Sequence, residues 1–144
     1  MNKNITPTLH KIAYYETDRM GCTHHSNYIR FMEEARMDFF DQLGWGYGRM
    51  EQEGIVSPVV DVSGQYRLQT TFDDVLEIHT ALAGLSAAKL TLTYTMYRKG
   101  QTEQPVFLGK SSHCFLDEKG RLVSIKKKYP ELYLLLTELM EENK

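Results

Sequence analysis

The pattern of hydrophobic and polar residues predicts one long helix in the first third of the chain. Over residues 27–43 the apolar side chains recur at helical spacing, and the charged side chains fall mostly on the opposite side. The apolar stripe consists of Tyr28, Met32, Ala35, Phe39 and Leu43, widened by Phe31 and Phe40. Ser26 or Asn27 can cap the start of this helix, and Gly44 is well placed to end it. The wide apolar girth predicts a largely buried helix.

Beyond residue 53 the period of the pattern changes to two, which is typical of β-strands. The expected strands are residues 60–68, 76–82, 90–97 and 106–116. A further strand is expected before the helix, at 9–15, and a turn at 117–120 leads to a short apolar segment at 122–125. Residues 45–53 fit a loop or a short second helix, and Pro130 suits the first turn of a final helix.

One helix followed by consecutive strands with short connections predicts an α+β fold with a mostly antiparallel sheet. The alternation predicts strands with one buried face and one more polar face. Because the long helix has a single sheet to cover it, we expect the sheet to wrap around it. A length of 144 residues fits one domain spanning 1–144.

Composition and charge narrow the class of protein. The formal net charge of −2 gives no support for a nucleic-acid binder, which carries a basic excess on one face. No apolar run is long enough to span a bilayer, and the amino terminus does not resemble a signal peptide. We therefore expect a cytoplasmic protein without membrane insertion. Its two cysteines, Cys22 and Cys114, are then expected to be reduced thiols.

The chemistry-bearing stretch is residues 15–28, YETDRMGCTHHSNY, which leads directly into the long helix. A metal site at His24 and His25 is disfavoured, because adjacent residues rarely face the same ion and no cluster of ligands is present. A nucleophilic thiol at Cys22 is a second possibility, but no thiolate-stabilising motif accompanies it. Neither interpretation accounts for Asp18, the acid in the glycine-containing turn of the stretch.

Asp18 stands a glycine turn away from the start of the helix, at His25 to Asn27. The first turn of a helix has free N–H groups and a partial positive charge, which can stabilise a developing oxyanion. A carbonyl carbon held between these groups and Asp18 would be polarised on one side and attacked from the other. The competing interpretation is that Asp18 only caps a turn and that both histidines are loop residues.

The pattern Asp-x-x-Gly-x-x-x-His-x-Asn-Tyr at 18–28 resembles the signature of hotdog-fold acyl-CoA thioesterases of the 4-hydroxybenzoyl-CoA thioesterase and YbgC-like type. The lead-in Tyr-Glu-Thr at 15–17 belongs to the same pattern. Weaker resemblances continue through 30–36 in the helix, through 72–74 before a strand, and to the turn after Asp117. The resemblance covers the chain to about Tyr129.

The resemblance implies a hotdog fold, in which a long central helix is wrapped by an antiparallel sheet of five to six strands. It implies a homodimer or homotetramer that hydrolyses an acyl-CoA thioester without a metal or other cofactor. Asp18 matches the catalytic carboxylate, which acts as nucleophile or as general base. The backbone N–H of His25 matches the group that polarises the thioester carbonyl.

Candidates for substrate contacts are less specific. Glu33 matches a position that can face the acyl group in the hydroxybenzoyl enzyme, although a solvated or interface-paired role fits equally well. Lys126, Lys127 and Lys128 form a positive cluster that could meet the phosphates of CoA, and Arg67 is a further candidate. Two alternatives keep the same fold: an acyl carrier protein thioesterase using the same Asp18, and a non-catalytic protein that binds acyl thioesters.

Overall fold

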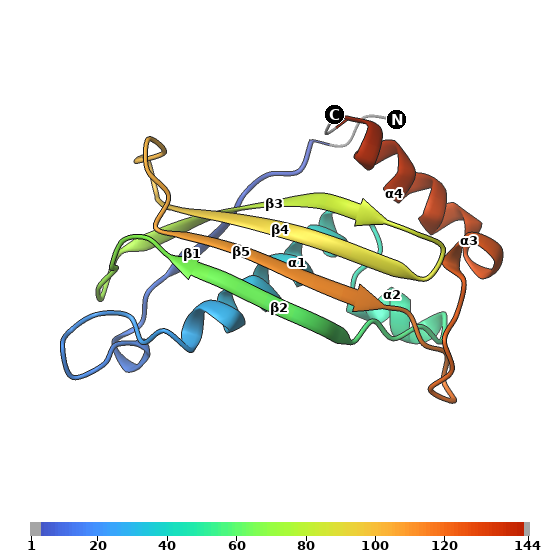
Figure 1. The fold of residues 1–144 in the computed structure, drawn as a ribbon, viewed down its shortest axis with the longest axis horizontal. Coiled ribbons are helices and arrows are strands. Elements are labelled where there is room, and N and C mark those ends of the chain that lie inside the picture. The colour runs from blue at the N-terminus through green and yellow to red at the C-terminus, as the bar shows by residue number, and fades with distance from the viewer. Residues whose placement is uncertain (1–3, 143–144) are drawn as a thin grey trace.

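The computed structural model describes residues 4–142, which form a five-stranded antiparallel sheet lying across a long helix (Figure 1). The strands are β1 (Thr8–Lys11), β2 (Val59–Tyr66), β3 (Val75–Leu85), β4 (Lys89–Arg98) and β5 (Phe107–Cys114). The helices are the 3₁₀ turn η1 (Tyr14–Glu16), α1 (Asn27–Gln42), α2 (Tyr47–Gln52), α3 (Ile125–Lys128) and α4 (Pro130–Glu142). The order across the sheet is β1-β3-β4-β5-β2. The expected α+β architecture is confirmed.

The long helix α1 forms where the apolar stripe predicted it. Every residue of that stripe is buried, and each belongs to the same core as the inward side chains of β3 and β4. The helix ends at Gln42, and Gly44 just beyond its C-cap has a φ of +82°, a left-handed conformation that glycine adopts without steric cost. The carboxyl-terminal helix α4 adds its leucine face to this core and packs on β3.

Two strand predictions were wrong. The first strand stops at Lys11, and residues 14–16 turn into η1 instead of continuing to Tyr15. The strand β2 does not bury one face: all its residues are exposed, and it lies at an edge of the sheet, paired only with β5. The remaining alternating segments confirm the expected pattern, with the apolar residues of β3 and β4 turned inward.

The arrangement puts the start of α1 and its preceding loop at one end of the sheet, on the left of Figure 1, and α2, α3 and α4 toward the other end. Within residues 4–142 no helix combines the length and the apolar character that a bilayer crossing requires. Both cysteines are free thiols.

Candidate active site

A tight turn before α1 holds Asp18 in a fixed orientation. Its N–H donates to the Cys22 carbonyl at 2.7 Å, and Gly21 donates back to the Asp18 carbonyl at 2.9 Å. The side-chain Oδ1 accepts from the N–H groups of Met20 at 2.9 Å and Cys22 at 3.3 Å. Asp18 therefore does hold a turn, but with one oxygen only. Its Oδ2 accepts no hydrogen bond from any residue in the described part of the chain.

In the described part of the chain, the backbone N–H of His25, two residues before α1 begins at Asn27, is an open donor. Neither Ser26 nor Asn27 caps the helix as expected: Ser26 makes no capping bond, and the Asn27 amide donates to the Glu16 carbonyl at 2.8 Å. The N–H of His24 donates to the same carbonyl at 2.8 Å. The N–H of His25 makes no hydrogen bond to another residue between 4 and 142. An open donor at a helix N-terminus is the group that can stabilise an oxyanion.

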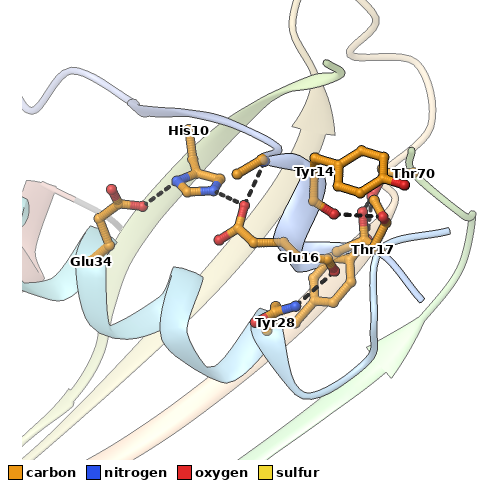
Figure 2. Close-up of polar contacts among 10 residues, drawn as sticks. His10, Tyr14, Glu16, Thr17, Tyr28, Glu34 and Thr70 are labelled. Carbon is orange, nitrogen blue, oxygen red and sulfur yellow. Dashed lines mark hydrogen bonds and ion pairs between the residues drawn. The ribbon is translucent and has the colours of Figure 1, made fainter. Parts of the chain in front are cut away.

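The buried carboxylate of Glu16 helps to hold the segment before α1 against the helix (Figure 2). Glu16 is only 7% exposed, and its Oε1 accepts from the Ala13 N–H and contacts His10 Nε2, both at 2.8 Å. The other ring nitrogen of His10 lies 2.9 Å from an oxygen of Glu34 on α1. The His10 ring thus lies between two carboxylates, one from η1 and one from α1. The cluster ties η1 to α1.

Asp18 and His25 line the same pocket, which has a volume of about 410 Å³. The other walls include Cys22, Tyr66 and Arg67. The Tyr66 hydroxyl donates to the His25 carbonyl at 2.8 Å, so β2 is fixed directly to the start of α1. The fold thus brings together Asp18, the His25 backbone and Arg67, three of the groups that the sequence singled out.

The structure gives little support to the two alternatives for this stretch, a metal site at the histidines and a nucleophilic thiol at Cys22. The rings of His24 and His25 stack on each other at a centroid distance of 4.2 Å, and His24 Nδ1 bonds Ser26 at 2.8 Å. Among residues 4–142 no group of three or more metal-binding side chains occurs. The Cys22 thiol lines the pocket and donates to the Gln69 side chain at 3.1 Å, and no histidine between residues 4 and 142 is hydrogen-bonded to its sulfur.

The other sequence candidates lie apart from Asp18 within one chain. Glu33 is exposed two turns further along α1, where it lines two smaller hollows and not the Asp18 pocket. The three exposed lysines 126–128 form α3, at the other end of the sheet in Figure 1. Lys126 and Lys128 lie near the rings of Tyr133 and Tyr129, at 5.9 and 5.8 Å.

Sequence reasoning missed several residues that build the site. Tyr66 was counted as an apolar strand residue, and Glu16 only as part of the motif's lead-in. Thr70 was not considered, yet its hydroxyl bonds Tyr28 at 2.7 Å and Thr23 at 2.6 Å, two residues that line the pocket. Burial raises the pKa of the Tyr28 hydroxyl, against the Thr70 hydrogen bond that lowers it, so Tyr28 is a neutral wall. The one available signal was polar residues inside apolar patterns.

Comparison with known proteins was made on sequence and on fold. A family model described as the thioesterase-like superfamily matches residues 12–135. A Bacillus subtilis protein provisionally named acyl-CoA thioesterase YneP is 29% identical over 121 residues, which cover 84% of this chain and 87% of that protein.

Solved structures agree with this match. A Thermus thermophilus protein of unassigned function, TT1821, is 34% identical, with a TM-score of 0.84 over 93% of this chain and 98% of its own. A DHNA-CoA thioesterase from Staphylococcus aureus is 24% identical, with a TM-score of 0.89 over 96% of this chain and 92% of its own. The expected hotdog fold is confirmed.

Proposed function

The chain belongs to the thioesterase-like superfamily and is a thioester hydrolase, and we propose that it hydrolyses acyl-CoA with Asp18 as the catalytic carboxylate. The observation that carries the proposal is one pocket lined by both Asp18 and His25, the residue with the open backbone N–H just before α1. One group can attack the thioester carbonyl carbon, and the other can stabilise its oxygen. YneP, the acyl-CoA thioesterase-like relative, supports CoA as the thiol.

The proposed reaction has two possible first steps. In the nucleophilic route, the free oxygen of Asp18 bonds to the carbonyl carbon, the C–S bond breaks, and CoA leaves as its thiolate, which takes up a proton. Water then hydrolyses the acyl anhydride and restores the carboxylate. In the general-base route, Asp18 takes a proton from water, which attacks the carbon directly; the C–S bond then breaks, and the leaving CoA thiolate takes the proton from Asp18. In both routes the oxygen carries negative charge beside the His25 N–H and the helix dipole.

The two oxygens of Asp18 support this role unequally. Oδ1 is held by the backbone of its own turn, which fixes the carboxyl plane without occupying Oδ2. A preorganised group loses little entropy on reaching the reactive geometry. We propose that Oδ2 is the reacting oxygen.

Recognition of the CoA end is proposed for Arg67, since it is exposed and lines the same pocket. Its Nη2 donates to Gln65 at 2.8 Å, which leaves other donors of the guanidinium for a phosphate. Lys126, Lys127 and Lys128 can meet the same CoA only from another subunit, because α3 lies at the far end of the sheet. Glu33 is proposed to face the acyl side.

The exposed edge strand favours a homodimer. On β2, Val59 is 53% exposed, Val60 54% and Val62 38%, beside the open backbone edge of the sheet. Apolar edge strands invite pairing with another chain. We propose that β2 pairs with a second copy of itself, which places a partner next to the pocket that Tyr66 lines. A Val62→Lys substitution is expected to halve the mass in solution, measured by light scattering, whereas Lys110→Ala on the neighbouring β5 leaves it unchanged.

The alternative of an acyl carrier protein thioesterase keeps one supporting observation. Arg67 is the only cation that lines the pocket among the described residues, fewer than a nucleotide with three phosphate groups would favour. Comparison of rates on an acyl-CoA and on the matching acyl-pantetheine separates the two. A large advantage of the CoA ester supports CoA recognition, and equal rates support the carrier protein.

The decisive experiment is a hydrolysis assay over short, medium, long-chain and aromatic acyl-CoAs, with the Asp18→Asn variant beside the wild type. Asparagine keeps the Oδ1 acceptor of the turn and removes the charge, so the fold is conserved. We expect a loss of about 100-fold or more in rate, the size of a positioned acid/base group. The matched control, Cys22→Ala, alters the same pocket and should keep activity within about threefold.

Near-wild-type activity of Asp18→Asn removes Asp18 from the mechanism, and a large loss in Cys22→Ala restores the thiol alternative. No hydrolysis of any thioester by a folded protein supports the non-catalytic binding role.

A further inference from the structure

The turn that carries Asp18 is joined to α1 through the loop of residues 67–74, between β2 and β3. The N–H of Thr23, which follows this turn, donates to the Thr70 carbonyl at 2.8 Å. The Thr70 hydroxyl lies 2.6 Å from that of Thr23 and 2.7 Å from that of Tyr28 on α1. The position of Thr70 therefore helps to set where Asp18 lies relative to the start of the helix.

The guanidinium of Arg98 holds this loop from the middle of the sheet. Arg98 is the last residue of β4, the central strand of the five. Its Nη2 donates to the Gln69 carbonyl, and its Nε lies 3.5 Å from Oδ2 of Asp74. Gln69 lines the Asp18 pocket, whereas Arg98 does not. Arg98 thus binds the loop at two points from outside the pocket.

The loop depends on such contacts because part of its backbone is unfavourable. Asp73 has a φ of +71°, a left-handed conformation in which a side chain is crowded. A conformation of this kind persists only where the surrounding structure holds it. The carbonyl of Asp74 accepts from the Ile12 N–H at 2.8 Å, and its Oδ2 accepts from the Thr71 N–H at 2.8 Å. Because Arg98 contacts that same Oδ2, it braces the carboxylate that holds the turn.

Partial burial makes this contact stronger than a fully exposed ion pair. The side chains of Arg98 and Asp74 are 31% and 29% exposed, so water screens their charges only in part. The planar fork of a guanidinium also fixes the direction of its hydrogen bonds, which a lysine ammonium does not. Burial raises the pKa of the Tyr28 hydroxyl, while its hydrogen bonds and the positive charge of Arg98 act against that rise. The guanidinium therefore lies near this wall of the pocket as well as near the loop.

We propose that Arg98 is a positioning residue for the hydrolysis: by fixing the 67–74 loop, it holds the Asp18 carboxylate in place relative to the N–H of His25. The inference rests on the proposed thioesterase function, in which one of these groups attacks the thioester carbonyl and the other stabilises its oxygen. Arg98 touches neither the substrate nor the reacting atoms. Its removal leaves the chemical groups present and changes their relative geometry, to which reaction rates are sensitive.

The test measures kcat and KM on one acyl-CoA for Arg98→Ala and for the wild type. We expect kcat to fall about 10- to 100-fold and KM to change less than about threefold, because transition-state geometry is lost and binding is kept. The matched control Lys99→Ala removes the next cation of the chain, whose side chain is exposed, and should leave both constants unchanged. An unchanged kcat in folded Arg98→Ala overturns the inference. A loss of kcat that only follows the unfolded fraction, measured by Trp45 fluorescence, overturns it as well.

Further variants separate positioning from folding. Arg98→Lys keeps the charge without the fork and should recover part of the lost kcat, and guanidinium chloride, far below unfolding concentrations, should restore activity to Arg98→Ala. Asp74→Asn keeps an acceptor for the Thr71 N–H and removes the ion pair, so it tests the contact even if Arg98→Ala folds poorly. We expect its kcat to fall about threefold. Activity that stays lost in Arg98→Lys and with guanidinium contradicts the inference, as does an unchanged kcat in Asp74→Asn.

Amide hydrogen exchange measures the same coupling without any substrate. In Arg98→Ala, residues 17–24 and 69–74 should exchange about tenfold faster than in the wild type, whereas α4, at the other end of the sheet, should keep its rate. Unchanged exchange at 17–24 overturns the inference whatever the activity. If the wild type hydrolyses no thioester, the proposed function fails, and the exchange rates still report separately whether Arg98 holds the turn.

Discussion

The two ends of α1 are built in opposite ways. At its C-terminal end the helix closes on itself: Gly44 donates to the Asp41 carbonyl at 3.0 Å, and Trp45 donates to the Phe40 carbonyl at 2.9 Å. Arg49 then covers the Trp45 ring at 3.6 Å. These two hydrogen bonds satisfy carbonyls at the end of the helix with N–H groups that are close in sequence. The backbone carbonyls at the C-terminal end are therefore satisfied by residues close in sequence, while the Gln42 side chain also bonds the backbone of Thr6.

At the N-terminal end, no side chain of the described residues caps the helix, and the N–H of His25 makes no hydrogen bond to any of them. This end is held from outside, by the Glu16 carbonyl and the Tyr66 hydroxyl. This difference indicates which end of a helix can serve a function. A helix end that satisfies its own groups stabilises the fold, while an end fixed by neighbours keeps donors available for a substrate.

The largest expected effect is a loss of stability in acid, which concerns both ends of α1 because the helix lies over the buried His113. The pKa of His113 falls to about 4 in the folded chain because of burial and Arg36, from an ordinary value of 6.5. The unfolded chain therefore binds more protons between these values. The stability contribution of the neutral ring is complete above pH 6.5 and is lost as the pH falls to 4, by about 3 kcal/mol.

Urea unfolding measures this loss through the fluorescence of Trp45, the single tryptophan, which reports on the C-terminal end. Hydrolysis activity reports on the N-terminal end. Both probes should give the same midpoint at each pH, and His113→Gln should flatten the acid dependence. Equal acid sensitivity in His113→Gln would assign the effect to other groups.

The second prediction concerns a substitution, Glu16→Ala, that disturbs only the N-terminal end of α1. Glu16→Ala removes the acceptor of the Ala13 N–H and of His10, which leaves buried groups unpaired and loosens η1. We expect kcat/KM to fall by about 10- to 100-fold, because small displacements of catalytic groups are costly. Glu34→Ala removes the exposed partner of the same His10 and should cost less than about threefold. Equal losses in both variants would contradict a special role of Glu16.

The local pattern of the sequence was sufficient to predict the C-terminal end of α1 and the hydrophobic core. The apolar stripe of α1, the stop at Gly44 and the inward residues of β3 and β4 depend on neighbours in the chain, and all were predicted. The spacing of Asp18 and His25 was also readable, because both lie in one turn-helix segment.

The groups that hold the N-terminal end of α1 were not predicted, because their partners are distant in sequence. Tyr66 bonds a carbonyl 41 residues away, and Thr70 bonds Tyr28 across 42 residues. The alternation in β2 looks the same for an edge strand as for a half-buried strand. Likewise, the charge of lysines 126–128 is a local property, and only the fold shows that α3 lies far from Asp18.

A third prediction breaks the C-terminal end. Gly44→Ala puts a side chain on a backbone with φ of +82°, where no neighbouring atom lies within 4 Å of the added Cβ. The cost is therefore conformational, about 1–2 kcal/mol of unfolding free energy, with kcat unchanged. The control Gly48→Ala lies inside α2 in equally open space at an ordinary φ, and should be neutral or stabilising by about 0.5–1 kcal/mol. Reduced kcat in folded Gly44→Ala would mean that the two ends are coupled.

The smallest expected effect tests the link between β2 and the open end. Tyr66→Phe deletes the hydroxyl that donates to the His25 carbonyl and keeps the ring, which packs on Tyr28 and Phe107 at 5.4 and 5.1 Å. Because Tyr66 is 53% exposed, water can replace the lost donor. We expect kcat/KM to fall about fivefold, equivalent to about 1 kcal/mol, at an unchanged melting temperature. Tyr15→Phe, at a tyrosine 84% exposed, should have no effect. If Tyr66→Phe lowers the melting temperature and leaves kcat/KM unchanged, this hydrogen bond stabilises the fold and does not position the N-terminal end for catalysis.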